Sequence, residues 1–134
     1  MKRTFLDACV LIAAFRSEPS PARDAIRRIM SEPDRLFVAS DYLRLETLPK
    51  PLFNERQAEA DALYVCFEEI VRECVPSSPE LSASAFELAR KHGLGALDAL
   101  HTAAAISAGV DEFWTMEKPT KPIHRVIELS VKGL

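Results

Sequence analysis

The chain has 134 residues, 48% of them hydrophobic, and this length and composition suit one domain with one core, spanning residues 1–134. The formal net charge of −3 neither requires nor excludes a nucleic-acid substrate, because phosphate binding depends on where basic residues cluster. The apolar stretches are too short or too interrupted to span a membrane, and Asp7 argues against a secretory signal. We therefore expect a cytoplasmic protein with no membrane partner.

The three cysteines form no recognisable metal-binding pattern. The chain has an odd number of cysteines, and no two of them have C-x-x-C spacing: Cys9, Cys66 and Cys74. Cysteines of this kind are usually small apolar residues in a reducing compartment. We therefore do not expect a zinc site.

The first part of the chain alternates between strand-like and helical patterns. Residues 2–7 are typical of a first strand, and a helix or helical turn is expected directly after it, over 8–16. A second helix is predicted over 20–32, because Pro21 suits its first turn. Residues 36–39 then predict a short second strand.

The middle of the chain is predicted to be helical. A third helix, capped by Ser40 or Asp41, is expected to end or kink near the prolines of residues 49–51. The longest helix is predicted over 54–74. Its apolar stripe, over 58–71, is wide enough to cover the sheet and permits contact with a second subunit, although core packing is the better explanation.

The last part of the chain returns to the alternating pattern. Helices are predicted over 80–92 and 96–108, and strands over 112–116 and 125–131. Strands that alternate with helices imply a sheet covered on both faces. We therefore predict an α/β fold, a three-layer α/β/α sandwich with a mostly parallel central sheet of four to five short strands.

Four acidic residues follow strands or lie on helices at one expected edge of this sheet: Asp7, Glu46, Asp98 and Glu117. In open α/β sheets, ligands bind outside the carboxyl ends of the strands, where Asp7 and Glu117 are expected. Carboxylates that converge repel one another unless a cation lies between them. The sequence therefore predicts a metal site built from oxygen ligands.

Each acid taken singly has a simpler explanation. Asp7 can cap the helix that follows it, and Asp98 is favoured by about 0.3–1 kcal/mol near a helix N-terminus. Glu46 suits the solvent edge of an amphipathic helix, and Glu117 suits an ordinary loop. These explanations do not predict that all four acids occur together in this order.

The four acids lie in short motifs that keep a characteristic order. The motifs are Leu6-Asp7-Ala8-Cys9-Val10-Leu11-Ile12, Leu45-Glu46 after a Ser/Asp cap, Gly93-Leu94-Gly95-Ala96-Leu97-Asp98-Ala99-Leu100-His101, and Trp114-Thr115-Met116-Glu117. In this order they resemble the PIN domain, a small metal-dependent ribonuclease fold shared by many bacterial toxin nucleases. One motif alone is weak, but four in sequence are fairly specific and cover nearly the whole chain.

The resemblance implies both an activity and a set of partners. The activity is hydrolysis of phosphodiester bonds in single-stranded or structured RNA, with Mg²⁺ or Mn²⁺ as cofactor. Asp7, Glu46, Asp98 and Glu117 would be the catalytic residues and the metal ligands. RNA would be the substrate, a homodimer is expected, and an antitoxin protein would be a partner if the chain is the toxin of a toxin–antitoxin pair.

One position departs from the family's pattern. The fourth acid is usually aspartate, and the extra methylene of Glu117 shifts the carboxylate by about one bond length, comparable to the Mg²⁺–oxygen distance of about 2.0–2.1 Å. A reduced site of Asp7, Glu46 and Asp98 would then remain. Thr115 is a candidate supporting oxygen donor.

Basic and histidine side chains flank the acids. We expect RNA contacts from four of the basic residues, although solvated surface charge is the alternative for each: Arg44, Lys118, Lys121 and Arg125. His101 follows Asp98 by three residues and shares its helix face. It is interpreted as a structural histidine outside the site.

Two other classes of function are weighed against the nuclease. A non-catalytic PIN-like module that binds RNA or protein is the alternative that Glu117 makes credible. A receiver domain would need a pair of aspartate and lysine residues that we do not find. A haloacid-dehalogenase-type phosphatase would need a second acid after Asp7-Ala8, where the chain has Cys9.

Overall fold

The computed structural model describes residues 1–16 and 18–134. The strands are β1 (Lys2–Leu6), β2 (Arg35–Ser40), β3 (Val71–Val75), β4 (Glu112–Thr115) and β5 (Val131–Gly133). The α-helices are α1 (Ala8–Phe15), α2 (Pro21–Met30), α3 (Asp41–Thr47), α4 (Pro49–Phe53), α5 (Gln57–Val65), α6 (Pro79–His92) and α7 (Ala96–Ser107). A π-helical turn, η1 (Cys66–Ile70), and a 3₁₀ turn, η2 (Pro122–Arg125), complete the elements of the described chain.

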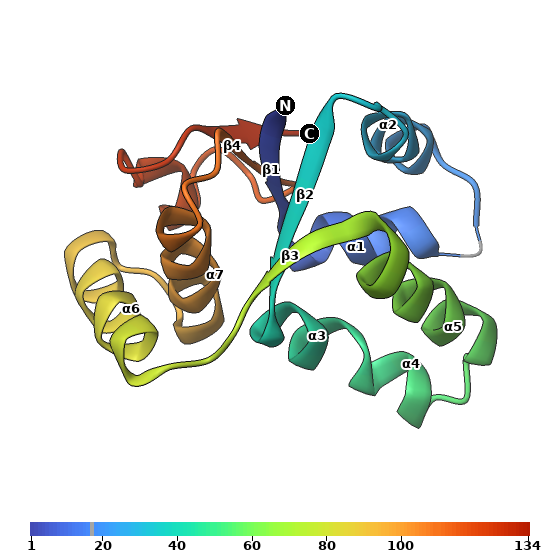
Figure 1. Cartoon of the computed structure of the whole chain (residues 1–134), viewed down its shortest axis with the longest axis horizontal. Coiled ribbons are helices and arrows are strands. Elements are labelled where there is room, and N and C mark those ends of the chain that lie inside the picture. Colours follow the sequence, from blue (N-terminus) through green and yellow to red (C-terminus); the bar gives the residue numbers. More distant parts are fainter. Residues whose placement is uncertain (17) are drawn as a thin grey trace.

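The strands form one parallel sheet in the order β3-β2-β1-β4-β5. In Figure 1 the sheet stands between two helical layers, with α6 and α7 on one side and α1, α2 and α5 on the other. Such a sheet needs both faces covered, because its strands are apolar on both sides. The predicted three-layer α/β/α sandwich is confirmed.

The first half of the chain follows the prediction because side chains cap its helices. Ser20 Oγ accepts a hydrogen bond of 3.0 Å from the Arg23 N–H at the start of α2. Ser40 Oγ accepts one of 3.3 Å from the Leu43 N–H at the start of α3. Each bond satisfies an N–H group that lacks a partner within its helix, which sets where the helix begins.

The single long helix predicted over residues 54–74 is wrong. Helix α5 ends at Val65, η1 continues it to Ile70, and the chain then becomes the extended strand β3, Val71–Val75. Strand β2 offers an open edge there, and β3 pairs with it in parallel. Periodicity cannot reveal that pairing, and valines such as Val71 and Val75 suit a strand as well as a helical stripe. The predicted apolar stripe is therefore not one continuous helix face.

The strand predicted over residues 125–131 is also largely wrong. The 3₁₀ turn Pro122–Arg125 occupies the start of that region, and the strand is the short β5, Val131–Gly133. Ile123 and Val126 are buried in the core, which holds this segment as a compact turn. Strand β5 follows this turn and pairs in parallel with β4, with Val131 opposite Phe113.

A buried ion pair lies at the end of the sheet where β2 and β4 begin. The guanidinium of Arg35 and the carboxylate of Glu112 are in contact, with only 10% and 4% of their side chains exposed. Glu112 also accepts a hydrogen bond of 2.9 Å from Thr4 Oγ1, and Arg35 lies 6.0 Å from the Trp114 ring centre. Glu112 is therefore a structural acid, at the strand end away from Asp7.

No helix in residues 1–16 and 18–134 is long and apolar enough to cross a membrane. The core instead fills the space between sheet and helices. Phe5 of β1 and Phe113 of β4 stack with ring centres 5.2 Å apart, and both are buried. Their packing holds together the two neighbouring strands that end next to the candidate site.

Candidate functional site

Asp7 and Thr115 meet where β1 and β4 end side by side. The Asp7 N–H donates to the Trp114 carbonyl at 2.9 Å, which extends the pairing of the two strands by one residue. Asp7 Oδ1 accepts from the Ala8 N–H at 2.8 Å, and Oδ2 accepts from Thr115 Oγ1 at 2.9 Å. Asp7 is thus a helix cap and also a buried carboxylate, 4% exposed, at the sheet edge predicted from sequence.

Thr115 joins Asp7 to Glu117. Its hydroxyl donates to Asp7 and accepts a hydrogen bond of 3.1 Å from the Glu117 N–H. The carbonyl of Glu117 lies 2.8 Å from His124 Nε2, which ties the loop to η2. Thr115 is fully buried and its hydroxyl is engaged in both directions, so it positions the two acids rather than facing an open site.

Glu46 of α3 is held by His101 of α7. The Oε2 atom of Glu46 lies within hydrogen-bond distance of His101 Nε2, and His101 is fully buried. From sequence, His101 is interpreted as a structural histidine outside the site, but its partner is one of the candidate acids, and sequence spacing gave no signal of that contact.

Asp98 responds to the charge of the other three acids. Its pKa is raised from the ordinary value, first by burial and next by the negative charge of Asp7. Glu117 and Glu46 also raise the pKa of Asp98, while His101 lowers it. Asp98 therefore lies close enough to the other three candidate acids for their negative charge to affect its pKa.

The four carboxylates are nevertheless not gathered around one point. Within the described residues, no three His, Cys, Asp or Glu side chains are placed so that they could hold a metal ion. Glu46 is turned toward His101, and one oxygen of Asp7 toward Thr115. The chemistry of the set still fits a hard cation, because all four donors are carboxylates and their mutual repulsion would be relieved by positive charge.

Cys9 lies against Asp7 but is a poor nucleophile. Its thiol is 3.6 Å from Asp7 Oδ2 and accepts from the Met116 N–H at 3.4 Å. Burial and then the charge of Asp7 raise the pKa of the Cys9 thiol to about 11. The thiol is therefore protonated at neutral pH, whereas a reactive cysteine needs a lowered pKa.

The basic residues predicted to contact RNA lie in two places. Arg44 stacks on Phe67, with its guanidinium carbon 5.0 Å from the ring centre. Lys118, Lys121 and Arg125 are exposed around the loop that follows Glu117. Arg44 is thus partly engaged by an aromatic ring, and the other three remain open to solvent.

Comparisons with known proteins agree with this arrangement. The family model described as PIN domain matches residues 4–118. A crystal structure of VapBC2 from Rickettsia felis, bound to a DNA fragment from their promoter, has a chain 15% identical to this one, with 98% of both chains covered and a TM-score of 0.72. Mycobacterium tuberculosis VapC20, a sarcin–ricin loop cleaving toxin, is 20% identical, with 82% of this chain and 86% of its own covered and a TM-score of 0.65. A search of curated proteins found no match.

Each line of comparison supports a different statement. At identities below 25%, the two solved structures show a shared fold, and the VapC proteins are what this chain resembles. The family model covers most of the chain and includes Asp7, Glu46, Asp98 and Glu117. The chain belongs to the PIN domain family.

Proposed function

We propose that this protein is a metal-dependent endoribonuclease. The observation that supports the proposal is the buried Asp7 carboxylate, 4% exposed, where β1 and β4 end side by side, together with the negative charges of Asp7, Glu117 and Glu46, which raise the pKa of Asp98. The family match and the fold shared with VapC20, a sarcin–ricin loop cleaving toxin, support the same activity. Asp7, Glu46 and Asp98 would hold Mg²⁺ or Mn²⁺, with Glu117 as the fourth acid.

The chain's own residues have defined tasks in this proposal. A bound Mg²⁺ or Mn²⁺ supplies an activated water molecule and stabilises negative charge on the phosphate. Thr115 fixes the Asp7 carboxylate, and His101 fixes that of Glu46. Cys9 is not proposed as a nucleophile, because burial and the charge of Asp7 raise the pKa of its thiol to about 11.

A protein partner is proposed from the similarity of the fold to a chain of the VapBC2 structure. The fold covers 98% of a chain in the VapBC2 crystal structure, which also holds a promoter DNA fragment. We propose that this chain is the toxin of a toxin–antitoxin pair, with a small antitoxin as its inhibitor and a homodimer as its assembly. An antitoxin encoded beside it would support the toxin assignment.

Cleavage of single-stranded RNA tests the proposed activity. We expect cutting with Mg²⁺ or Mn²⁺, none with a chelator, and a loss of about a thousandfold in Asp7→Asn, because several kcal/mol of metal-dependent stabilisation is lost. The initial rate of cleavage is the measurement. Asp34→Asn, at an exposed carboxylate before β2, is the matched control and should cut at the normal rate.

Two outcomes of this assay would reject the nuclease. Cutting that survives in Asp7→Asn would indicate a contaminant or a misassigned site. RNA binding without cutting, under every metal tried, would favour the non-catalytic binding module instead.

Replacing Thr115 tests its positioning role. Thr115→Val keeps the size of the side chain but removes the hydroxyl between Asp7 and the Glu117 N–H. We expect cleavage to fall about 10–100-fold, as for other groups that orient metal ligands, and the Mg²⁺ requirement to rise. Thr115→Ser restores the hydroxyl and should recover most of the rate. A valine variant with the normal rate at all Mg²⁺ concentrations would contradict this role.

A further inference from the structure

Arginine side chains gather in a cavity between α1, α2 and α5. The cavity has a volume of about 410 Å³, and four arginines contribute to its lining: Arg16, Arg23, Arg27 and Arg56. The one carboxylate among the lining residues is Glu59, which lies 3.7 Å from Arg56. Positive charge is therefore in clear excess here.

This cavity continues toward the candidate site. A second cavity of about 290 Å³ shares Phe15, Arg16, Arg56 and Glu59 with the first, so the two adjoin. The second cavity is also lined by Lys50 and by Glu46, one of the four acids. We call the two together the arginine groove; it runs from α2 to Glu46.

Two of the arginines are fixed by the end of α1. Arg27 Nε donates to the Ala14 carbonyl at 2.9 Å, and Arg23 Nη1 donates to the Arg16 carbonyl at 2.9 Å. These carbonyls lie where a helix leaves acceptors without partners of its own. The guanidinium groups of Arg23 and Arg27 are thereby held along the groove before any ligand arrives.

The other two arginines are open to solvent. Arg16 is exposed, and 65% of the Arg56 side chain is exposed. Glu59, 18% exposed, offsets one positive charge, and three of the four arginines that line the first cavity remain in excess. Because Arg16 and Arg56 are exposed, both side chains can be replaced without disturbing the core.

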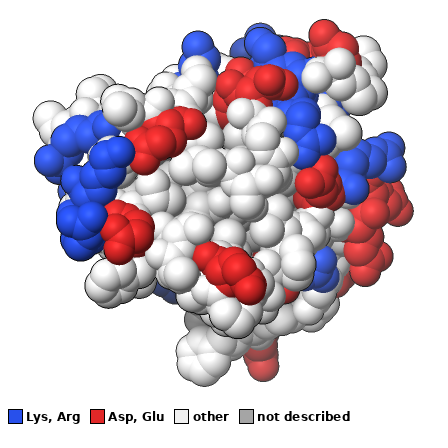
Figure 2. Space-filling view, turned by 60° about the vertical axis from the view of Figure 1, so that its left-hand side comes forward, with Lys and Arg blue, Asp and Glu red and all other residues white. Residues whose placement is uncertain are grey.

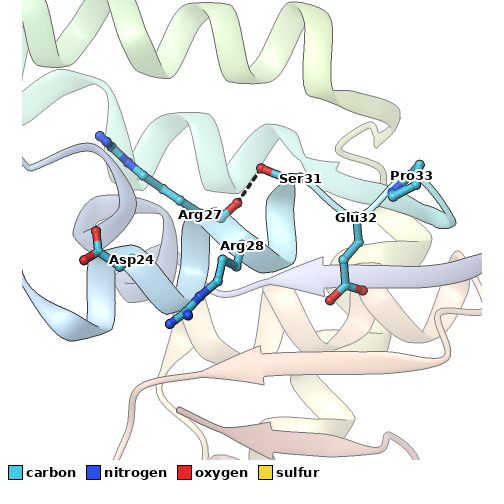
Figure 3. A pocket seen from close by; sticks show the side chains of 6 residues that line it. All are labelled: Asp24, Arg27, Arg28, Ser31, Glu32 and Pro33. Atoms are coloured by element: carbon cyan, nitrogen blue, oxygen red, sulfur yellow. Dashed lines mark hydrogen bonds between the residues drawn. The ribbon is translucent and has the colours of Figure 1, made fainter.

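Two other cavities of the described chain lack this excess of charge. The cavity in Figure 3 has Arg27 and Arg28 balanced by Asp24 and Glu32, and the Arg27 side chain points away from Glu32. A further cavity pairs Arg35 and Arg72 with Glu32 and Glu69. In Figure 2, the centre of the face that comes forward is uncharged, with basic side chains toward its margins.

We propose that the arginine groove binds the sugar–phosphate backbone of single-stranded RNA and leads the strand to Glu46. The proposal rests on the proposed ribonuclease function. Arginine presents donors in a fork that matches phosphate oxygens, and Phe15 offers an aromatic ring for base stacking. These residues are not among those predicted from sequence to contact RNA, because Arg16, Arg23 and Arg56 are brought together only by packing of α1, α2 and α5.

RNA suits the groove better than an acidic protein segment does. The groove ends at Glu46, one of the proposed metal ligands, and without a cation the acids there would repel a carboxylate and a phosphate alike. A backbone that passes into a metal-filled acid cluster instead brings its phosphate to the place of cleavage. The position of the groove therefore favours the substrate as occupant.

Binding of a 12-nucleotide, fluorescein-labelled single-stranded RNA tests the groove. Fluorescence anisotropy with chelator present separates binding from cleavage, and the full chain is used throughout. We expect Arg16→Gln/Arg56→Gln to weaken binding about tenfold at 0.1 M KCl and to lower the salt-dependence slope by about 1.4, or about 0.7 per lost phosphate contact. The control Arg28→Gln/Arg72→Gln removes the same charge outside the groove and should reduce both quantities much less.

The outcomes separate this proposal from the ribonuclease itself. Equal affinity of the two double variants for RNA would reject the proposal that the groove binds RNA, even if the protein cuts RNA. Selective loss in Arg16→Gln/Arg56→Gln would support the groove, even if no metal produces cutting. Binding of polyglutamate in place of RNA would assign the groove to an acidic peptide and overturn it as an RNA site. Thermal unfolding at an unchanged temperature shows that each variant is folded.

Discussion

Asp98→Asn is expected to lower RNA cleavage about a thousandfold and, in the same protein, to stabilise the metal-free fold. Loss of a metal ligand removes about 4 kcal/mol of transition-state stabilisation, which is three powers of ten in rate. The fold gains because burial and the charges of Asp7, Glu117 and Glu46 raise the pKa of Asp98. An ionised carboxylate at this position opposes folding, and asparagine removes that cost because it is neutral.

The pH dependence of this gain has a definite sign. A folded-state pKa above the unfolded value makes Asp98 cost stability as the pH rises through that range, and the full cost is present at neutral pH. Asp98→Asn should therefore raise the free energy of unfolding at pH 7 by about 0.5–1 kcal/mol, a small gain because Asp98 is only partly buried and solvent screens the repulsion. Below pH 4 the two proteins should differ little.

Asp24→Asn is the matched control for the Asp98 experiment. Asp24 also lies in the first turn of a helix, α2, but away from the candidate site. Its replacement should cost about 0.3–1 kcal/mol, because a carboxylate there interacts favourably with the helix dipole. Urea denaturation with chelator measures both variants. If Asp98→Asn also lost stability at pH 7, Asp98 would be a structural carboxylate, and the repulsion argued for the site would be wrong.

The second large effect is expected at the opposite end of the sheet, with no change in the chemistry. Glu112→Gln leaves the Arg35 guanidinium, 10% exposed, without its buried charge partner. Breaking a buried pair costs about 3–5 kcal/mol, and we expect about 3 kcal/mol because Glu32 still pairs with Arg35. This is a large part of the 5–15 kcal/mol typical of a whole domain.

A surface pair provides the control for the Glu112 experiment. Glu87 and Arg90 also form an ion pair, but 62% and 67% of their side chains are exposed. Glu87→Gln should change the free energy of unfolding by less than about 1 kcal/mol. Urea denaturation measures the loss, and the cleavage rate per folded molecule should be normal in both variants. A cost for Glu112→Gln as small as that for Glu87→Gln would mean that the pair is not an effective structural contact.

Local signals along the chain predicted most of the fold but misjudged two segments. Serine caps and the left-handed Gly93, with φ of 71°, mark helix ends through contacts within a few residues. Strand β3 and the short β5 depend on partners far away in sequence, the open edges of β2 and β4. Apolar spacing records that a residue is buried but not which strand it pairs with.

The candidate site was predicted in part for the same reason. The sequence indicated the acids through their places next to strands and helix starts, and the charges of the other three raise the pKa of Asp98. It did not indicate that His101 holds Glu46, or that Thr115 lies between Asp7 and the Glu117 N–H. The contact of His101 with Glu46 and that of Thr115 with Asp7 join residues 55 and 108 positions apart, and no short motif encodes either of them.

The sequence by itself determined the fold class and the PIN family, and it predicted the four acids as a site, because periodicity, capping and motif order are properties of neighbouring residues. Only the tertiary structure decided which strands pair, which partners hold the carboxylates, and where arginines from three helices meet. The physical reason is packing. Burial of the core against both faces of the sheet brings side chains that are distant in sequence close enough to form hydrogen bonds and to interact electrostatically. The four acids are thus a prediction of the chain, and their surroundings are a product of the fold.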